Sequence, residues 1–187
     1  MKAVGIVGSP RKGGNTEILT AHCLKAISEE GIKTELVRLA GLDISGCNAC
    51  GYCHKHEGCS IKDDMQTVYK KMVAADALIV ASPVYYGSAT SLVKAVLERA
   101  GFMSFRKKPF AGKVGGPLVV ARRAGQNFTF AELLFWFHIN GIVNPGSTYW
   151  NIAFGREKGE VEKDEEGMRT AWNFGKNVAY VVKKLKG

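Results

Sequence analysis

Four of the five cysteines in this chain lie in one short segment, spaced as Cys47-x2-Cys50-x2-Cys53-x5-Cys59. Nearby glycines allow sharp turns, so the segment can wrap around a compact group. Three cysteines at successive two-residue gaps are typical of a [4Fe–4S] cluster, although this run lacks the shorter last gap and the proline. Zinc sites usually pair two such units across a longer gap. A cluster is therefore our leading hypothesis, with zinc and free thiols as alternatives, and Cys23 is predicted to lie in the core.

A second segment suited to chemistry is the run G-S-P-R-K-G-G-N-T of residues 8–16. It links an apolar run to a helical pattern, so free N–H groups at a helix N-terminus should face an anion there. A nucleotide-triphosphatase P-loop is disfavoured, because Gly14-Asn15 replace its lysine and hydroxyl residue. The dinucleotide-binding motif G-x-G-x-x-G is also absent. The segment predicts a cradle for one phosphate monoester, bound without metal by Ser9, Arg11, Gly14, Asn15 and Thr16.

The scaffold that must position these segments alternates between strand and helix along the whole chain. Strands are predicted at 2–8, 33–39, 77–82, 114–121 and 148–153. Helices are predicted at 15–30, 64–75, 88–101, 128–140 and 165–185, with a Cys- and Gly-rich loop at 43–63 after the second strand. This order predicts an α/β fold, a three-layer αβα sandwich around a five-stranded parallel sheet, in one domain over residues 1–187. The loops after the first, third and fourth strands should form the site, because ligands bind beyond the carboxyl ends of such strands.

The glycine-rich run resembles the FMN phosphate loop of flavodoxin-like NAD(P)H-dependent FMN reductases. The resemblance continues at S-P-V-Y-Y-G-S of residues 82–88, similar to the segment that holds the isoalloxazine ring, and more loosely at A-R-R-A-G-Q of residues 121–126. It covers nearly the whole chain. It implies the strand order 2-1-3-4-5, FMN as cofactor and NAD(P)H as a candidate reductant. The further FMN contacts that it implies are Pro83, Val84, Tyr85, Tyr86, Gly87, Ser88, Arg122 and Gly125.

The 82–88 segment also suits a flavin on physical grounds. Pro83 and Gly87 bracket a rigid turn, and Tyr85 and Tyr86 offer ring faces and hydroxyls. Exposed backbone N–H groups can bind the polar edge of the ring and tune its potential.

The cysteine motif within such a chain resembles the iron–sulfur flavoproteins of anaerobic archaea and bacteria. The resemblance implies that Cys47, Cys50, Cys53 and Cys59 hold a [4Fe–4S] cluster beside FMN. It also implies a homodimer or homotetramer that receives electrons from ferredoxin or another small electron carrier. No Ser/His/Asp constellation is apparent, so we expect the two cofactors to carry electrons to a small-molecule acceptor. The alternatives are an NAD(P)H-dependent FMN or quinone reductase with an unoccupied cysteine loop, and a thiol- or metal-responsive sensor.

The formal charge of +9 is concentrated rather than uniform. Residues 104–125 carry six cations and no acid, whereas residues 155–167 carry three cations and six acids. Neither an aromatic-interleaved basic run nor zinc-finger spacing is present, which argues against nucleic-acid binding. We therefore interpret the basic segment as a surface that steers an acidic electron carrier.

The first residues, M-K-A-V-G-I-V-G, are too short an apolar run for a signal peptide, and no stretch is long enough to span a membrane. A cytoplasmic protein with reduced thiols is expected. The helical segment 128–139 is apolar nearly all round, so it should be buried on more than one side. The sheet can cover only one of these sides, which predicts a partner subunit against another.

Overall fold

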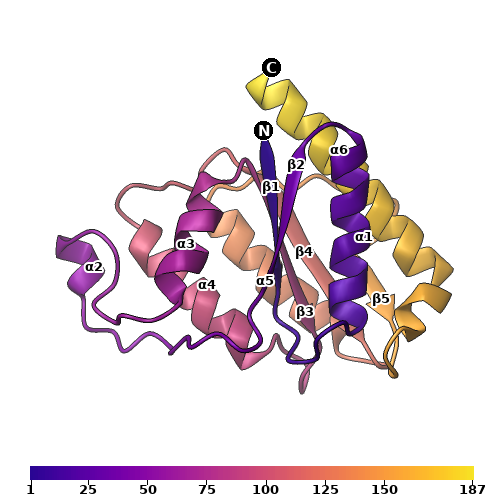
Figure 1. The fold of residues 1–187 in the computed structure, drawn as a ribbon, viewed down its shortest axis with the longest axis horizontal. Helices are drawn as coiled ribbons and strands as arrows, with labels where there is room; N and C mark the ends of the chain where they lie inside the picture. The colour runs from indigo at the N-terminus through magenta and orange to yellow at the C-terminus, as the bar shows by residue number, and fades with distance from the viewer.

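The computed structural model describes residues 1–187, whose five strands form one parallel sheet in the order β2-β1-β3-β4-β5 (Figure 1). The predicted α/β class, the parallel sheet and its strand order are confirmed. The central strands β3 and β4 are buried along almost their whole length, because helices cover both faces of the sheet. The strands are β1 (Lys2–Val7), β2 (Lys33–Arg38), β3 (Ala77–Pro83), β4 (Val114–Ala121) and β5 (Ile152–Phe154).

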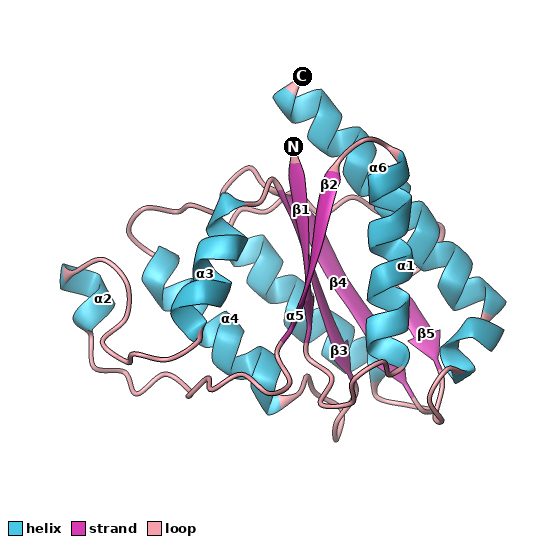
Figure 2. Cartoon of the chain, in the orientation of Figure 1, coloured by secondary structure: helices cyan, strands magenta, loops and turns pink.

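Helices form a layer on each side of this sheet (Figure 2). One layer consists of α1 (Asn15–Glu29) and α6 (Glu165–Lys186). The other consists of α3 (Met65–Ala74), α4 (Ser91–Ser104) and α5 (Gln126–Ile139). Each layer has its own hydrophobic core, and the predicted core position of Cys23 is confirmed in the layer of α1 and α6. None of the helices is both long and apolar enough to cross a membrane.

Helix α4 begins three residues later than predicted, at Ser91 rather than at position 88. Residues 85 to 88 form a tight turn instead, in which the backbone groups of Tyr85 and Ser88 bond to each other at 2.9 and 3.0 Å. Tyr86 and Gly87 at its tip both have positive φ, at 51° and 79°, which is typical of a two-residue hairpin turn. Thr90 then caps the helix by accepting the N–H of Val93.

Strand β5 is shorter than predicted and begins at Ile152 rather than at position 148. Alternate residues of β4 face β5, as the bond from the N–H of Val119 to the carbonyl of Asn151 shows. Pro117 lies two residues earlier on the same side and has no N–H to donate, so pairing cannot extend further back. The Asn151 side chain bonds to the Pro117 carbonyl at 3.2 Å instead.

Two short helical turns were not predicted. The α2 helix (Tyr52–Lys55) lies within the cysteine loop, which runs from the end of β2 past the layer of α3 and α4 to one side of the molecule (Figure 1). The 3-10 turn η1 (Glu160–Lys163) lies between β5 and α6.

Candidate functional site

The glycine-rich loop between β1 and α1 forms an open cradle of N–H groups. Gly8 must be glycine, because a Cβ there would lie 1.9 Å from Cγ2 of Val93. Gly13 has a φ of 63° and donates its N–H to the Glu17 carboxylate at 2.9 Å. Beyond it, the N–H groups of residues 15–17 at the start of α1 have no acceptor in the protein. These free N–H groups form the N-terminus of a helix, where an anion is favoured.

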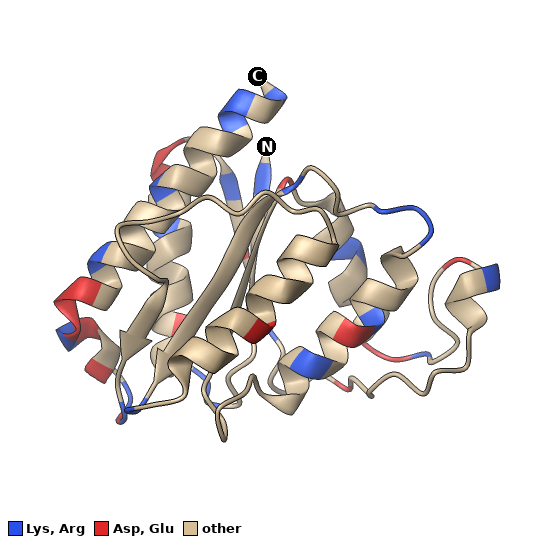
Figure 3. Cartoon of the chain, turned by 180° about the vertical axis from the view of Figure 1, so that it is seen from behind, with Lys and Arg blue, Asp and Glu red and all other residues tan.

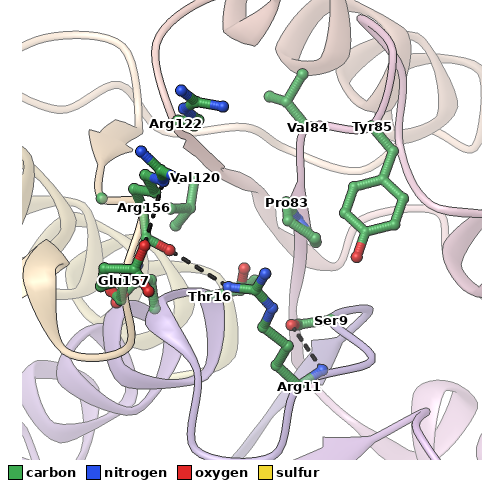
Figure 4. A pocket seen from close by; sticks show the side chains of 12 residues that line it. Ser9, Arg11, Thr16, Pro83, Val84, Tyr85, Val120, Arg122, Arg156 and Glu157 are labelled. Atoms are coloured by element: carbon green, nitrogen blue, oxygen red, sulfur yellow. Dashed lines mark hydrogen bonds and ion pairs between the residues drawn. The ribbon is translucent and has the colours of Figure 1, made fainter.

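Hydroxyls and a guanidinium group complete this cradle. Ser9 and Thr16 are buried, and the Ser9 hydroxyl accepts the N–H of Arg11 at 3.2 Å. The Arg11 guanidinium donates to the carbonyl of Arg156 at 3.3 Å (Figure 4). Gly14 is the N-cap of α1, and a Cβ there would lie 3.1 Å from the Arg11 carbonyl. The predicted set Ser9, Arg11, Gly14 and Thr16 is therefore brought together at one helix N-terminus.

Asn15 has a different role from the one predicted for its side chain. Its Nδ2 donates to the carbonyl of Glu157 at 2.8 Å. Its Oδ1 accepts the N–H groups of Gly159 and Val161 at 2.8 and 3.4 Å. The amide is thus held by the loop after β5, and the backbone N–H of Asn15 and the second N–H of its Nδ2 remain for an anion.

That loop after β5 supplies residues that the sequence analysis missed. Gly155, Arg156 and Glu157 line the cavity of about 360 Å³ at the carboxyl ends of the strands. They could have been found by the rule already applied to the other strands, because they follow β5 directly. The complete lining is Ser9, Arg11, Asn15, Thr16, Pro83, Val84, Tyr85, Val120, Arg122, Gly155, Arg156 and Glu157.

The loop after β3 contributes only part of its predicted set to this cavity. Pro83, Val84 and Tyr85 line it, across from Arg122 and Arg156 (Figure 4). Tyr86 is fully exposed, and together with Gly87 it lines a neighbouring concavity of about 320 Å³ with Val84, Arg122, Arg123 and Ala124. The N–H groups of Tyr86 and Gly87 still have no protein acceptor.

Ser88 and Gly125 also act differently from the predicted flavin contacts. The Ser88 hydroxyl donates to Glu132 of α5 at 2.8 Å, so it anchors the turn rather than lining the cavity. Gly125 is the N-cap of α5 and has a φ of 85°. A Cβ there would lie 2.9 Å from Cγ1 of Val84 and 3.0 Å from Cα of Gly87. Its hydrogen side chain allows the loops after β3 and β4 to touch.

The charges of this cavity favour an anion. Arg11, Arg122 and Arg156 come from three different loops and line the same cavity, opposed only by Glu157. Free helix N–H groups, hydroxyls and three guanidinium groups form a donor set suited to a phosphate monoester, and the walls of Pro83, Val84 and Val120 are apolar. FMN combines a phosphate with a planar ring and so fits the residues present.

The cysteine loop is closed at its base by acidic side chains. Asp64 accepts the N–H of Asp43 at 2.9 Å, and Asp63 accepts that of Ser45 at 3.0 Å. Gln66 of α3 donates to the carbonyls of Ile61 and Cys59, at 2.7 and 3.5 Å. The two ends of the loop are thus held side by side, and all four cysteines lie in the segment between them.

All four loop cysteines line a single cavity of about 140 Å³. The pKa of the Cys53 thiol is raised by burial and by the nearby Cys59, Cys47 and Cys50. A hydrogen bond from Ser60, whose Oγ lies 3.1 Å from Sγ of Cys50, lowers the pKa of the Cys50 thiol. Cys23 lies outside this set, and its burial raises its thiol pKa.

The four sulfur atoms differ in what they would offer to a single ion and to a polynuclear group. Four thiolates around one zinc ion would lie about 4 Å apart, given Zn–S bonds of about 2.3 Å in a tetrahedron. No three metal-ligating side chains of the chain are arranged to hold one ion. A [4Fe–4S] cluster, in contrast, takes each thiolate on a different iron atom and needs a wider cage. The cavity brings together four soft donors, which is the donor set that such a cluster takes.

A groove with a basic lining adjoins the cysteine cavity. Its volume is about 640 Å³, and it shares Cys53 and Met103 with that cavity. We call it the basic groove, because Lys55, Lys70, Arg106 and Lys107 line it against the single acid Glu57.

Comparisons with known proteins agree with both parts of this site. Residues 1–157 match the family model for NADPH-dependent FMN reductase. An iron-sulfur flavoprotein of Methanocaldococcus jannaschii is 37% identical over the full length of both chains. One of Methanosarcina thermophila is 36% identical, over 100% of this chain and 97% of its own. The flavodoxin-like WrbA-like protein of Agrobacterium tumefaciens superposes with a TM-score of 0.72 over 99% of both chains, at 18% identity, and so shares the fold.

Proposed function

The chain belongs to the NADPH-dependent FMN reductase family and is a flavin-dependent oxidoreductase, and from this premise we propose that it couples FMN to a [4Fe–4S] cluster. In this proposal, electrons arrive singly from a small electron-carrier protein and leave to a small acceptor. The observation that carries the proposal is the presence, in one chain, of a phosphate cradle at the sheet edge and a cavity lined by four cysteines. The name of the full-length relatives, iron-sulfur flavoprotein, supports it.

FMN would be held at the carboxyl ends of β1, β3, β4 and β5. Its phosphate would accept the free N–H groups at the start of α1, the hydroxyls of Ser9 and Thr16, and the Arg11 guanidinium. Its ring would lie against Pro83, Val84 and Tyr85, with Arg122 beside it. The free N–H groups of Tyr86 and Gly87 are placed in the same turn.

The cluster would be held by Cys47, Cys50, Cys53 and Cys59. When bound, a cluster would supply single electrons and a flavin would take up one or two, so the pair would convert one-electron delivery into two-electron reduction. The chain itself positions the ligands. The hydrogen bonds at the base of the loop hold its two ends together, and the four thiols line one cavity.

The basic groove supports an acidic carrier protein as the electron donor. Its cations line the same groove as Cys53, where electrons would enter. We expect the double change Lys55→Glu and Lys70→Glu to slow reduction by an acidic carrier such as ferredoxin by about tenfold at low salt, because rim charges act on association rates. Lys25→Glu, on the exposed side of α1, is the matched control. Equal rates in both variants at low salt would contradict this donor site.

Anaerobic purification followed by iron, sulfide and flavin analysis tests the proposal as a whole. Iron and sulfide together with flavin are expected, and Cys53→Ala or Cys59→Ala should remove the iron while leaving the flavin. Cys23→Ala is the matched control, since Cys23 is buried between α1 and the sheet and should leave both groups in place. Zinc or bare thiols in the wild type would overturn the proposal.

The second candidate is an NAD(P)H-dependent FMN or quinone reductase with an empty cysteine loop. The observation that favours it is the open concavity of Tyr86, Arg122 and Arg123 beside the flavin cavity, since it offers cations and an aromatic ring to a pyridine nucleotide. Flavin without iron, combined with rapid oxidation of NADH or NADPH, would establish this function instead.

We also propose that the protein is a homodimer or homotetramer through α5. Figure 3 shows this helix almost without charged residues, and Glu132 is the only one in its sequence. The side chains of Phe128, Phe135 and Ile139 are 76%, 71% and 84% exposed. They recur every seven and four residues, so they share one side of the helix and form an apolar stripe.

A further inference from the structure

A buried arginine, Arg99 of α4, lies in the wall of the cysteine cavity. Its side chain is 1% exposed, and it forms an ion pair with Asp63, whose side chain is 3% exposed, at 2.5 Å. A buried charge is costly unless it is paired and its hydrogen bonds are satisfied. The hydrogen bonds of this guanidinium therefore show which of its N–H groups remain for another acceptor.

The oxygen atoms around Arg99 use only part of its donor capacity. One terminal nitrogen, Nη1, donates to Asp63 and to the carbonyl of Ser45 at 3.2 Å. The other, Nη2, donates to the carbonyl of Ile61 at 3.2 Å. A guanidinium has five N–H groups, so three are used and two remain. The Nε group is buried without any partner.

The cavity that Arg99 lines is the one that holds the four sulfur atoms. Burial alone would lower the pKa of Arg99, but the hydrogen bond to Asp63 and the nearby Cys59 side chain raise it. An arginine side chain is always protonated in proteins, so this guanidinium places a buried positive charge in the wall of the cavity that Cys59 also lines. Asp63 and the two carbonyls belong to the ends of the loop, so the same side chain joins α4 to both of them.

Building on the proposed cluster, we propose that Arg99 is a positioning residue that directs its positive charge and its two free N–H groups at the cluster sulfurs and raises the reduction potential. One-electron reduction adds one negative charge to the group in the cavity, while Arg99 keeps its proton. A buried cation and its N–H donors stabilise that added charge more than the oxidised state. Asp63, paired with Arg99, opposes this effect while it holds the guanidinium in place.

The opposite charges of the pair allow a test that separates electrostatics from loop support. The midpoint potential of the cluster is measured by spectroelectrochemistry in Arg99→Gln and Asp63→Asn. Both changes loosen the base of the loop, so a purely structural role shifts the potential in the same direction in both. Our proposal expects a more negative potential in Arg99→Gln and a more positive one in Asp63→Asn. Shifts of one sign, or no shift, would overturn it.

Two further variants keep the test decisive. Arg169→Gln is the matched control, because Arg169 is an exposed arginine of α6, in the helix layer on the opposite face of the sheet. Its potential should match the wild type. Arg99→Lys keeps the charge: if iron is retained in this variant and lost in Arg99→Gln, the charge is needed, whereas equal loss in both makes Arg99 a clamp only. A wild type without iron and sulfide contradicts the cluster itself, which distinguishes the two failures.

Discussion

The side-chain amide of Asn15 joins two loops that lie 142 residues apart, through the bond from its Nδ2 to the carbonyl of Glu157 at 2.8 Å. The opposite side of the amide, Oδ1, accepts the N–H groups of Gly159 and Val161. Asn15 thus holds the loop after β5 against the phosphate cradle. A Cβ on Gly155 would lie 2.8 Å from Nδ2 of Asn15, so the contact leaves no room for a larger residue there.

We expect Asn15→Ala to weaken FMN binding by about tenfold, because hydrogen bonds worth about 1 kcal/mol each no longer hold the Arg156 loop in place. Titration of the flavin-free protein with FMN, followed by flavin fluorescence, measures this. Asn177→Ala is the control, since that amide also bonds to a backbone carbonyl, that of Gly146, but lies outside the site. Equal affinities in the two variants would contradict the role of Asn15.

A comparison of FMN with riboflavin tests the phosphate cradle. Arg11→Ala and Thr16→Val should reduce the affinity for FMN by about tenfold each, since charge-assisted and hydroxyl hydrogen bonds to a phosphate are lost. Riboflavin has no phosphate, so its affinity should not change. A parallel loss for both flavins would show that these residues support the fold of the loop rather than the phosphate.

Stability at acidic pH should report on Glu132, which holds the turn after β3. Burial would raise the pKa of this carboxyl, but hydrogen bonds from the Ala89 N–H, Lys94 and Ser88 lower it below its usual value of 4.5. A carboxyl whose pKa is lowered in the folded state stabilises the fold in full above about pH 4.5. This contribution is lost as the pH falls through the pKa of the folded state. The free energy of unfolding should therefore fall less steeply below pH 4.5 in Glu132→Gln than in the wild type. Chemical denaturation across pH 3–6 measures it, with Glu98→Gln, an exposed carboxylate of α4 without an ion pair, as the control.

The apolar stripe on α5 predicts the behaviour of a charged variant. Phe135→Glu should convert the assembly to monomers in light scattering, because a carboxylate would be buried without a partner. Tyr180→Glu on α6 replaces an equally large and exposed side chain outside the stripe and should leave the mass unchanged. A wild-type chain that is already monomeric would contradict the proposed assembly.

The sequence by itself determined the order of the elements and the location of the site. Its apolar runs and helical periods predicted all five strands and the five long helices, because burial of one face imposes a period on each element. The carboxyl-end rule then located the cavity at the loops that carry Ser9, Pro83 and Arg122. The cysteine spacing was likewise sufficient to single out four residues that line one cavity.

Only the tertiary structure decided which side chains of those loops face the cavity. Asn15 turns to the loop after β5, and Ser88 turns to Glu132, since each finds a partner from a distant part of the chain. Arg99 is a further example, because the sequence shows only a charged residue within a helical segment. The folded chain pairs it with Asp63 and places it in the wall of the cysteine cavity. Local sequence patterns encode which face of an element is buried. Hydrogen bonds between distant residues depend instead on how the elements pack, so these pairings appear only in the folded chain.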